Sequence, residues 1–486
     1  MFARVTAAAL ALAVVTGGFV TPARAQSGDQ ACVGDTDANA VPRKPGPRLR
    51  FGIGPLVQAG QIGGGPAAAK PEQPARTHEA LSQLRPPRGP FALRLNRLFW
   101  SDGEAGIERY LGLARRFTSR GYLVELQLRY HPTPEQEGDI AAWTRYVREV
   151  VRRFGANPGV TAIQVANEVN ITFSPDSSDG AYDGAREALV KGVIAAKDEA
   201  RRLGLAGRLA IGFNWAYRLD PASETSFWNG VRDRGGRAFV RALDWIGLDA
   251  YPGTVFTPVN TPGGERDNMV NAMSALRCYA RIPGIPPSVP MRVEENGWPT
   301  QPPARSYAEQ AEALRLMVRA VHEFRGTYHV TDYRWFNLRD GDTASPMLFQ
   351  HFGLLEDDYD RKPAFPAYRA LVRELTIRGS ATRRALRLRL RLRYRRGRDR
   401  RGRRCARGRV RATVAGPDRA FAIRAEFFRG RRRVARDTRP PLSRVVDRRR
   451  HRGRSHRHRV RARVRTGDGR LVRLSRRYRV CAGDLR

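Results

Sequence analysis

The sequence is poor in cysteine, and it lacks long hydrophobic runs. Its 486 residues include only four cysteines. None of them forms a C-x-x-C pair, so the spacing offers no zinc-type ligand set, and we expect no metal and no cofactor. Beyond an N-terminal apolar stretch, no run approaches the ~20 apolar residues that a membrane-spanning helix requires. We therefore expect a protein without a transmembrane segment.

Lysine is absent from the C-terminal part of the chain, where the positive charge is nevertheless concentrated. The formal net charge is +41. Residues 376–486 hold 42 arginines, no lysine and 7 acidic residues, which gives this segment a charge of +35. The chain is thus a near-neutral body followed by a very basic region. This distribution argues against a protein that coats nucleic acid along its whole length.

The first 25 residues resemble a secretory signal peptide more than an N-terminal core helix. Arg4 supplies the positive start, residues 7–15 are apolar, and Ala23-Arg24-Ala25 is a small-x-small cleavage site. We therefore expect a secreted, extracellular protein that is soluble or associated with the cell surface. Residues 26–48 are polar and contain proline, which predicts a flexible lead-in.

The four cysteines fit an oxidising compartment. Cys32 and Cys278 lie in the body, whereas Cys405 and Cys481 flank the basic region. One disulfide in each part is the simplest arrangement. Four cysteines allow three pairings, and the sequence alone leaves all three open.

Between residues 49 and 375, short apolar segments alternate with amphipathic helices. Residues 139–154 show the helical period most clearly, with apolar side chains recurring on one face. Strands are expected at residues 51–54, 91–99, 122–130, 160–165, 208–213, 245–249, 291–295 and 332–337. Eight such units in ~325 residues predict a (β/α)₈ barrel, the TIM-barrel fold, as the catalytic domain. An open, doubly wound sheet is the competing fold, but no G-x-G-x-x-G or G-x-x-x-x-G-K-[ST] motif supports it.

Residues 376–486 show a period of two instead. From Leu386 to Tyr394, apolar residues alternate with arginine, and further short strands are expected before turn-forming glycines. This pattern predicts a small all-β, sandwich-like domain with arginines on its solvent face. The charge of this domain has three interpretations: a solvated face without a partner, a surface that binds an anionic cell-envelope polymer, or a surface that binds nucleic acid. We favour the envelope polymer, and we do not expect nucleic acid because no recognition motif is present.

Polar side chains end the strands of the expected barrel, where the chemistry of this fold takes place. The fourth strand ends in Asn167-Glu168, and the seventh in Glu294-Glu295-Asn296-Gly297-Trp298. Two carboxyl groups at one barrel mouth suit the hydrolysis of a glycosidic bond. That reaction needs a proton donor for the leaving oxygen and a carboxylate at the anomeric carbon. Because side chains alternate along a strand, Glu294 and Glu295 are not both expected to face the site.

These strand ends resemble those of the clan A glycoside hydrolases, the 4/7 superfamily of retaining enzymes. In that clan an Asn-Glu pair closes strand four, as Asn167-Glu168 does here. The clan includes β-1,3-glucanase-like and cellulase-like TIM-barrel members. The β-1,3-glucanase-like members carry an E-[STN]-G-W-P segment, which is similar to Glu295-Asn296-Gly297-Trp298-Pro299 here. The resemblance implies Glu168 as the acid/base and Glu295, rather than Glu294, as the nucleophile.

The resemblance also implies further residues that bind the substrate or support the nucleophile. Arg94 and Tyr251 are expected to hydrogen-bond the nucleophile, Asn167 to bind the sugar 2-hydroxyl, and Trp335 to form an aromatic floor. Two strand-end residues, His131 and Asn214, are candidates for binding sugar hydroxyls. Several alternatives stay open: Arg94 as a structural ion pair with Arg97 serving the site, Tyr251 and Trp335 as core aromatics, and His131 as a structural residue. The basic region loosely resembles bacterial immunoglobulin-like appendages of secreted enzymes.

Taken together, the sequence predicts a secreted glycoside hydrolase that acts on a β-linked polysaccharide or glycoside by retaining double displacement. Retention predicts about 5–5.5 Å between the two carboxyl groups, and a separation of ~8 Å or more would contradict it. The alternatives are a non-catalytic glycan-binding surface protein and a transglycosylase on the same barrel.

Overall fold

The computed structural model describes residues 32, 38–57, 68–86, 89–254, 257–377, 387–416, 419, 422–437, 441–447, 456–466 and 471–481. The expected signal peptide, residues 1–25, lies outside these residues. So do residues 26–31 and 33–37 of the expected lead-in. No helix in the described part of the chain is both long enough and apolar enough to cross a membrane.

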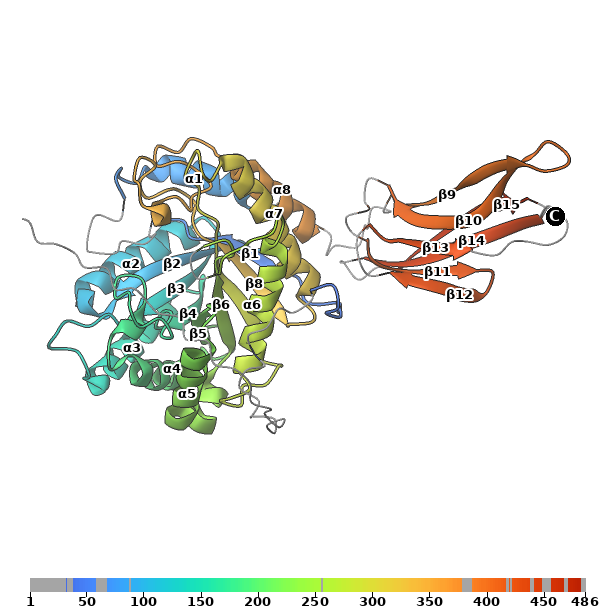
Figure 1. Ribbon diagram of the computed structural model, residues 1–486. Coiled ribbons are helices and arrows are strands. Elements are labelled where there is room, and N and C mark those ends of the chain that lie inside the picture. Colours follow the sequence, from blue (N-terminus) through green and yellow to red (C-terminus); the bar gives the residue numbers. More distant parts are fainter. Residues whose placement is uncertain are drawn as a thin grey trace, which may run out of the picture.

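The first part of the chain forms a closed barrel of eight parallel strands, with helices around it (Figure 1). Each strand pairs with its neighbour in sequence, and β1 closes the barrel against β8. The strands are β1 (Arg50–Ile53), β2 (Ala92–Phe99), β3 (Leu123–Arg129), β4 (Val160–Val165), β5 (Ala210–Ala216), β6 (Trp245–Ala250), β7 (Met291–Asn296) and β8 (Val330–Trp335). The predicted (β/α)₈ barrel is therefore confirmed.

Eight α-helices of the described residues accompany these strands. They are α1 (Pro74–Leu84), α2 (Gly103–Thr118), α3 (Ile140–Gly155), α4 (Ala185–Arg202), α5 (Pro221–Ala242), α6 (Glu265–Tyr279), α7 (Tyr307–Phe324) and α8 (Ala364–Ile377). Helices α1 and α5 were not predicted from the sequence. Helix α1 follows a Gly/Pro-rich segment, and α5 is interrupted at Gly236, whose backbone is non-helical. These glycines and prolines hide the helical period.

Helix α3 shows how the sequence determines a barrel helix. The Asp139 carboxylate accepts a hydrogen bond of 2.8 Å from the Ala142 amide and so caps the first turn. Apolar side chains at helical spacing, including Trp143, Val147 and Phe154, are buried against the strands. The buried face of this helix is the one that the sequence predicted.

The interior of the barrel carries a layer of buried charges below the mouth. The Arg334 guanidinium donates to Glu125 at 3.2 Å and to Asp332 at 2.8 Å. Burial and the negative charge of Glu125 raise the pKa of Glu294 well above its ordinary value. This shift favours the neutral form of Glu294, which would avoid a further buried charge.

Residues 38–48 lie against the barrel. Ala38 is fully buried, Arg43 forms an ion pair with Glu323 of α7, and the Lys44 amide donates to Thr327. A disulfide joins Cys32 to Cys278 at the end of α6, and a second one joins Cys405 to Cys481. Both disulfides match the simplest of the three pairings that the sequence allowed.

The second part of the chain is a separate all-β unit with its own hydrophobic core (Figure 1). Its strands are β9 (Arg389–Arg398), β10 (Arg404–Ala415), β11 (Ala422–Arg429), β12 (Arg432–Asp437), β13 (Ser443–Asp447), β14 (His456–Thr466) and β15 (Leu471–Val480). They form one seven-stranded sheet in the order β12-β11-β14-β15-β10-β13, with β9 paired to β10. The sheet curls so that its edge strands β12 and β13 come together, which encloses the apolar face as a sandwich would.

Candidate active site

A pocket opens at the carboxyl ends of the barrel strands. Strands β2 to β8 all contribute lining residues at or just beyond their ends. Both predicted catalytic residues line it, Glu168 beyond β4 and Glu295 on β7. Aromatic side chains lie along the rest of the wall, among them Tyr251, Phe336 and Phe352. A pocket that combines converging carboxyl groups with aromatic rings is suited to binding a sugar.

Glu295 on β7 is held by two donors, one from β2 across the barrel and one from just beyond the adjacent strand β6. The Arg94 guanidinium donates to Oε1, and the Tyr251 hydroxyl donates to Oε2. The Gln127 amide also approaches Oε1, at 3.5 Å. Both oxygens of this carboxylate therefore accept hydrogen bonds, one of them from a cation, which is the strong, charge-assisted kind.

Glu168 lies in a different environment. Its Oε2 accepts a hydrogen bond of 3.0 Å from the Ser178 hydroxyl, and its backbone amide donates to Asn214 Oδ1 at 2.9 Å. Burial, together with the negative charge of Glu295, raises the pKa of Glu168 to about 8. At neutral pH this carboxyl therefore holds its proton, whereas Glu295 is paired with a cation.

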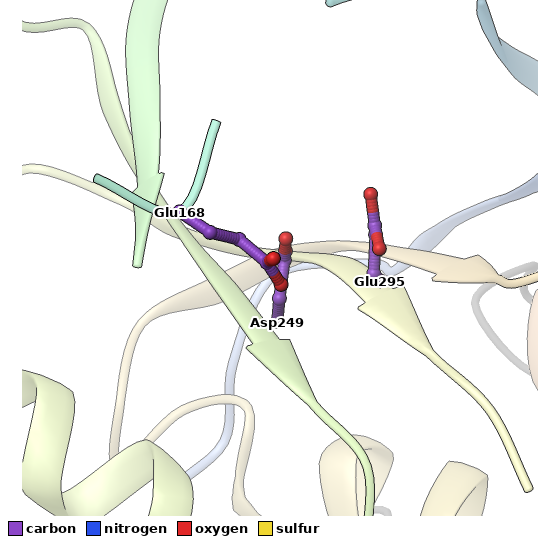
Figure 2. A group of neighbouring side chains, drawn as sticks. All are labelled: Glu168, Asp249 and Glu295. Atoms are coloured by element: carbon purple, nitrogen blue, oxygen red, sulfur yellow. The ribbon is translucent and has the colours of Figure 1, made fainter. Parts of the chain in front are cut away.

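A third carboxyl group, Asp249 on β6, was not predicted from the sequence. Glu168, Asp249 and Glu295 each place one oxygen within 4.8 Å of the others. In Figure 2, Glu168 extends toward Asp249, and Glu295 rises from the adjacent strand. Burial and the charge of Glu295 raise the pKa of Asp249 well above its ordinary value. Its Oδ2 accepts a hydrogen bond from Asn214, whereas its buried Oδ1 has no partner among the described residues.

Three converging carboxyl groups could also supply oxygen ligands to a cation. Here the guanidinium of Arg94 contacts Glu295, so a divalent cation in this position would lie beside a fixed positive charge. The raised pKa values of Glu168 and Asp249 favour protonation of these two groups, which relieves the repulsion between the three carboxyl groups. The chemistry that this arrangement best supports is therefore proton transfer next to an ionised carboxylate.

Buried amides position the end of β4. Asn167 Oδ1 accepts hydrogen bonds from Gln127 at 2.6 Å, Asn214 at 2.8 Å and Gln164 at 3.2 Å. Its Nδ2 donates to the Ser177 carbonyl at 2.8 Å. Asn167 lines the pocket, whereas Asn214 does not: it hydrogen-bonds the Glu168 backbone amide and the Asp249 carboxyl group.

An ion pair fixes the loop that follows Glu168. Arg129 Nε donates to Asp179 Oδ1 at 2.6 Å, and both side chains are buried. Asp179 Oδ2 also accepts from the backbone amides of Tyr130 and Asn167, each at 2.9 Å. Asp179 thus connects the ends of β3 and β4. Sequence reasoning missed this residue because it lies in a loop with no motif.

Two predicted sugar-binding residues lie elsewhere. Trp335 is fully buried, its indole NH points to the Phe352 carbonyl, and it does not line the pocket. The next residue, Phe336, lines the pocket instead, because the chain leaves the strand at this point. His131 is packed between Phe99 and Tyr182 and does not line the pocket either.

Glu294 and Glu295 are both buried, but only Glu295 lines the pocket. Both nevertheless approach Arg94, since Glu294 Oε2 lies 3.7 Å from Arg94 Nε. The pairing of β7 with β8 shifts between Val293 and Asn296, so strict alternation does not hold here. Simple alternation was therefore an incomplete argument, although the assignment of Glu295 to the pocket agrees with it.

Comparisons with known proteins add neither a family nor a curated relative. The chain matches no protein-family profile and no curated protein. Among solved structures, a β-glucuronidase of Bacteroides uniformis aligns over 90% of this chain and 46% of that chain, at 12% identity and a TM-score of 0.44. This chain thus spans less than half of the length of that enzyme.

Two other solved structures align over more of their own length. GH5_18 from Streptomyces cattleya, in complex with GlcNAc, aligns over 70% of this chain and 83% of that one, at 18% identity and a TM-score of 0.48. A fungal β-1,4-galactanase aligns over 60% and 89%, at 14% identity and a TM-score of 0.42. We transfer no function from structures this distant.

Proposed function

We propose that the protein is a glycoside hydrolase that cleaves β-linked glycosidic bonds with retention of configuration. The observation that carries this proposal is the placement of Glu168 and Glu295, whose nearest oxygens lie within 4.8 Å in one pocket. Inverting enzymes separate their carboxyl groups by roughly 6.5–9.5 Å to admit a water molecule, and retaining enzymes by roughly 5–5.5 Å. The separation here supports direct attack by a carboxylate.

In this proposal, the different environments of Glu168 and Glu295 support a different role for each. The Glu295 carboxylate, which accepts hydrogen bonds from Arg94 and Tyr251, attacks the anomeric carbon and forms a glycosyl ester. Glu168, which holds a proton, gives it to the departing glycosidic oxygen. Glu168 then removes a proton from water, the water oxygen bonds to the anomeric carbon, and the ester bond to Glu295 breaks.

Neighbouring groups serve substrate binding in this proposal. Asp249, neutral and with a free oxygen, is placed to hydrogen-bond a sugar hydroxyl beside the reacting carbon. Phe336 and Phe352 provide apolar faces on which a sugar ring can pack. A polysaccharide substrate and an extracellular location remain part of the proposal, and the two disulfides support the latter.

The stereochemistry of the product tests the proposal directly. We expect the purified protein, given a panel of β-glycosides and β-glycans, to release sugar first as the β-anomer, measured by proton NMR before mutarotation. Initial release of the α-anomer would contradict the retaining mechanism. Failure to cleave any member of the panel, together with measurable glycan binding, would favour the non-catalytic binding protein.

We also propose that the sheet domain binds a linear polyanion such as an anionic cell-envelope polymer. On β14, Arg457, Arg459, Arg461 and Arg463 are exposed, whereas Val460 and Ala462, which alternate with them, are buried in the core. Alternate residues of a strand lie about 6.7 Å apart, so these side chains form a straight row of charges. No carboxylate of the described residues lies within 4 Å of these four guanidinium groups.

The neighbouring strands extend this positive surface. Arg463 is directly opposite Arg473 on β15, and Arg459 is opposite Arg477. Like charges placed opposite each other destabilise a sheet, and a bound anion removes that repulsion. Glu426 on β11 is an acidic residue opposite Arg463, but its carboxylate already pairs with Arg424 and Arg433. The arginines of β14 are therefore not neutralised by Glu426 and can bind an external polyanion.

The salt dependence of binding tests this surface. We expect Arg459→Gln combined with Arg461→Gln to weaken binding to a purified teichoic acid and to reduce the slope of log K against log salt by about 1–2. The matched control is Arg400→Gln with Arg401→Gln, which removes the same charge from the turn between β9 and β10. Equal losses in both double variants would contradict a defined row. Equal affinity for single-stranded DNA would show that the polymer backbone is not discriminated.

A further inference from the structure

Arg97 lies in the pocket but has no role in the proposed reaction. It lies on β2, two residues before the strand ends, and lines the same pocket as Glu168 and Glu295. Arg94, on the same strand, already supports Glu295. Both Arg94 and Arg97 therefore lie near the site, but only Arg94 has a role in the proposed reaction.

The backbone of β2 is distorted where Arg97 enters the pocket. The pairing with β3 shifts between Leu95 and Leu98, because Asn96 and Arg97 together face the single residue Gln127. Arg97 has a φ of 66°, a left-handed conformation that long side chains rarely adopt. This bulge lets two successive residues, Asn96 and Arg97, line the pocket, where regular alternation would allow only one.

Similar backbone strain marks the other side of the same pocket. Among the described residues, only five other than glycine have a positive φ, and Ala166 and Glu168 at the end of β4 are two of them. Strain of this kind collects where a side chain must be aimed for function. We therefore interpret the left-handed backbone of Arg97 as a feature that positions its side chain in the pocket.

The guanidinium of Arg97 has no ion-pair partner among the residues that the structure describes. Within the described part of the chain, no carboxylate lies within 4 Å of it, and its side chain makes no hydrogen bond. It lies over the Phe99 ring at 5.3 Å, an arrangement that leaves the N–H groups in the guanidinium plane free. Burial and the neighbouring charge of Arg129 lower the pKa of Arg97, and the more distant charges of Asp176 and Asp102 raise it.

The other cations at the pocket are already neutralised. Arg129 forms a buried ion pair with Asp179, and Arg94 contacts Glu295. A neutral sugar over Arg97 would cover a cation without supplying a counter-ion, which is unfavourable. A carboxylate or sulfate would instead accept two parallel hydrogen bonds from its planar fork.

We propose that Arg97 binds an acidic group of the substrate, so that the glycan cleaved here contains a uronic acid or a sulfated sugar. This inference rests on the proposed glycosidase function and narrows its substrate class. The bulge in β2 aims the guanidinium at the acidic group, and Phe99 supports it from below. Arg97 is thus a specificity-determining residue, separate from the groups that perform the reaction.

The test uses pairs of substrates that differ only in the acidic group. Aryl β-glucuronide is compared with aryl β-glucoside, β-galacturonide with β-galactoside, and 6-sulfated glycosides with their unsulfated forms. We expect the wild-type protein to have the higher kcat/KM for the acidic member of at least one pair. Arg97→Gln should lower that value about tenfold to a hundredfold and change the neutral member less than about threefold. Arg97→Lys should recover part of the preference, and the pair that responds identifies a carboxylate or a sulfate.

Arg109→Gln is the matched control, because Arg109 is an exposed arginine of α2 that pairs with Asp102 away from the pocket. Equal losses for both members of every pair in Arg97→Gln would reveal a merely structural residue and overturn the proposal. So would a wild-type protein that prefers the neutral members. If no glycoside is cleaved, the proposed function fails, and calorimetry with glucuronate, galacturonate and galactose 6-sulfate decides on Arg97 separately. Binding that is lost in Arg97→Gln supports its role, and absence of binding refutes it.

Discussion

Replacing Glu295 with glutamine should lower kcat by about ten-thousandfold or more, because the substitution removes the carboxylate that forms the covalent intermediate. Glutamine has nearly the same shape and can still accept a hydrogen bond from Arg94 or Tyr251, so the fold should be retained. The measurement is steady-state hydrolysis of whichever β-glycoside the wild-type protein cleaves, with circular dichroism as the check on folding.

Two further variants sharpen this test. Glu312→Gln is the matched control, since Glu312 is a largely exposed residue of α7. Glu294→Gln addresses the neighbouring carboxyl group, which is neutral in the barrel, so an amide should replace it with a far smaller loss of activity. If Glu294→Gln abolished hydrolysis while Glu295→Gln preserved it, the nucleophile would be misassigned.

An external nucleophile gives an independent readout. With a smaller side chain at position 295, as in Glu295→Gly, azide can occupy the space of the carboxylate and attack the anomeric carbon in a single displacement. We expect this variant to form the α-glycosyl azide from an activated β-glycoside, with configuration inverted. Formation of the β-azide would contradict the placement of Glu295 below the sugar.

Replacing Glu168 with glutamine should produce a loss that depends on the leaving group. Natural glycans need a proton on the departing oxygen, so their hydrolysis should fall about a thousandfold. Activated aryl glycosides need little protonation, so their first step should be largely spared and the glycosyl ester should accumulate. The measurement is a burst of aryl alcohol followed by slow turnover.

The pH profile of the wild-type enzyme should follow the same group. Glu168 must be protonated to act as an acid, and its pKa is raised to about 8 by burial and by the charge of Glu295. We therefore expect kcat/KM to fall as the pH rises through about 8. The alkaline limb should disappear in Glu168→Gln when an activated aryl glycoside is used. If the alkaline limb persisted unchanged in Glu168→Gln, the limb would report the titration of a group other than Glu168.

The same shift has a consequence for stability. The unfolded chain releases the Glu168 proton near its ordinary pKa of 4.5, whereas the folded protein keeps it up to about 8. Within this window the folded state binds more protons than the unfolded state, so stability falls as the pH rises. Glu168→Gln should therefore raise the Tm relative to wild type by ~2 °C or more at pH 8, and by less at pH 5.

The sequence predicted the parts of the site that follow from strand order. Because parallel strands end at one rim, Glu168 and Glu295 were expected together, and the structure places their nearest oxygens within 4.8 Å. The resemblance to the clan A enzymes added Arg94 and Tyr251, and both donate hydrogen bonds to Glu295. The barrel itself followed from the alternation of strands and helices. The barrel and the meeting of the two carboxyl groups needed only periodicity and the rule that sites form at the carboxyl ends, whereas the roles of the individual residues came from the resemblance.

Sequence reasoning missed features that depend on the exact phase of a strand. The bulge in β2 and the register shift in β7 change which side chains face inward, and neither leaves a motif. Trp335 was predicted to face the sugar, but the chain leaves the strand at this residue and Phe336 takes that place. Asp249 precedes Tyr251 by two residues and so shares its face, a signal that could have identified it.

The arginine rows of the sheet domain carry a charge that no physiological proton concentration can alter. Guanidinium groups keep their proton above pH 12, and residues 376–486 contain no lysine that would lose its own earlier. Under the two proposed functions, a change in the pH of the surroundings would therefore alter turnover through Glu168 without detaching the molecule. Release would instead follow ionic strength, so that where the protein resides and how fast it works respond to two different properties of the medium.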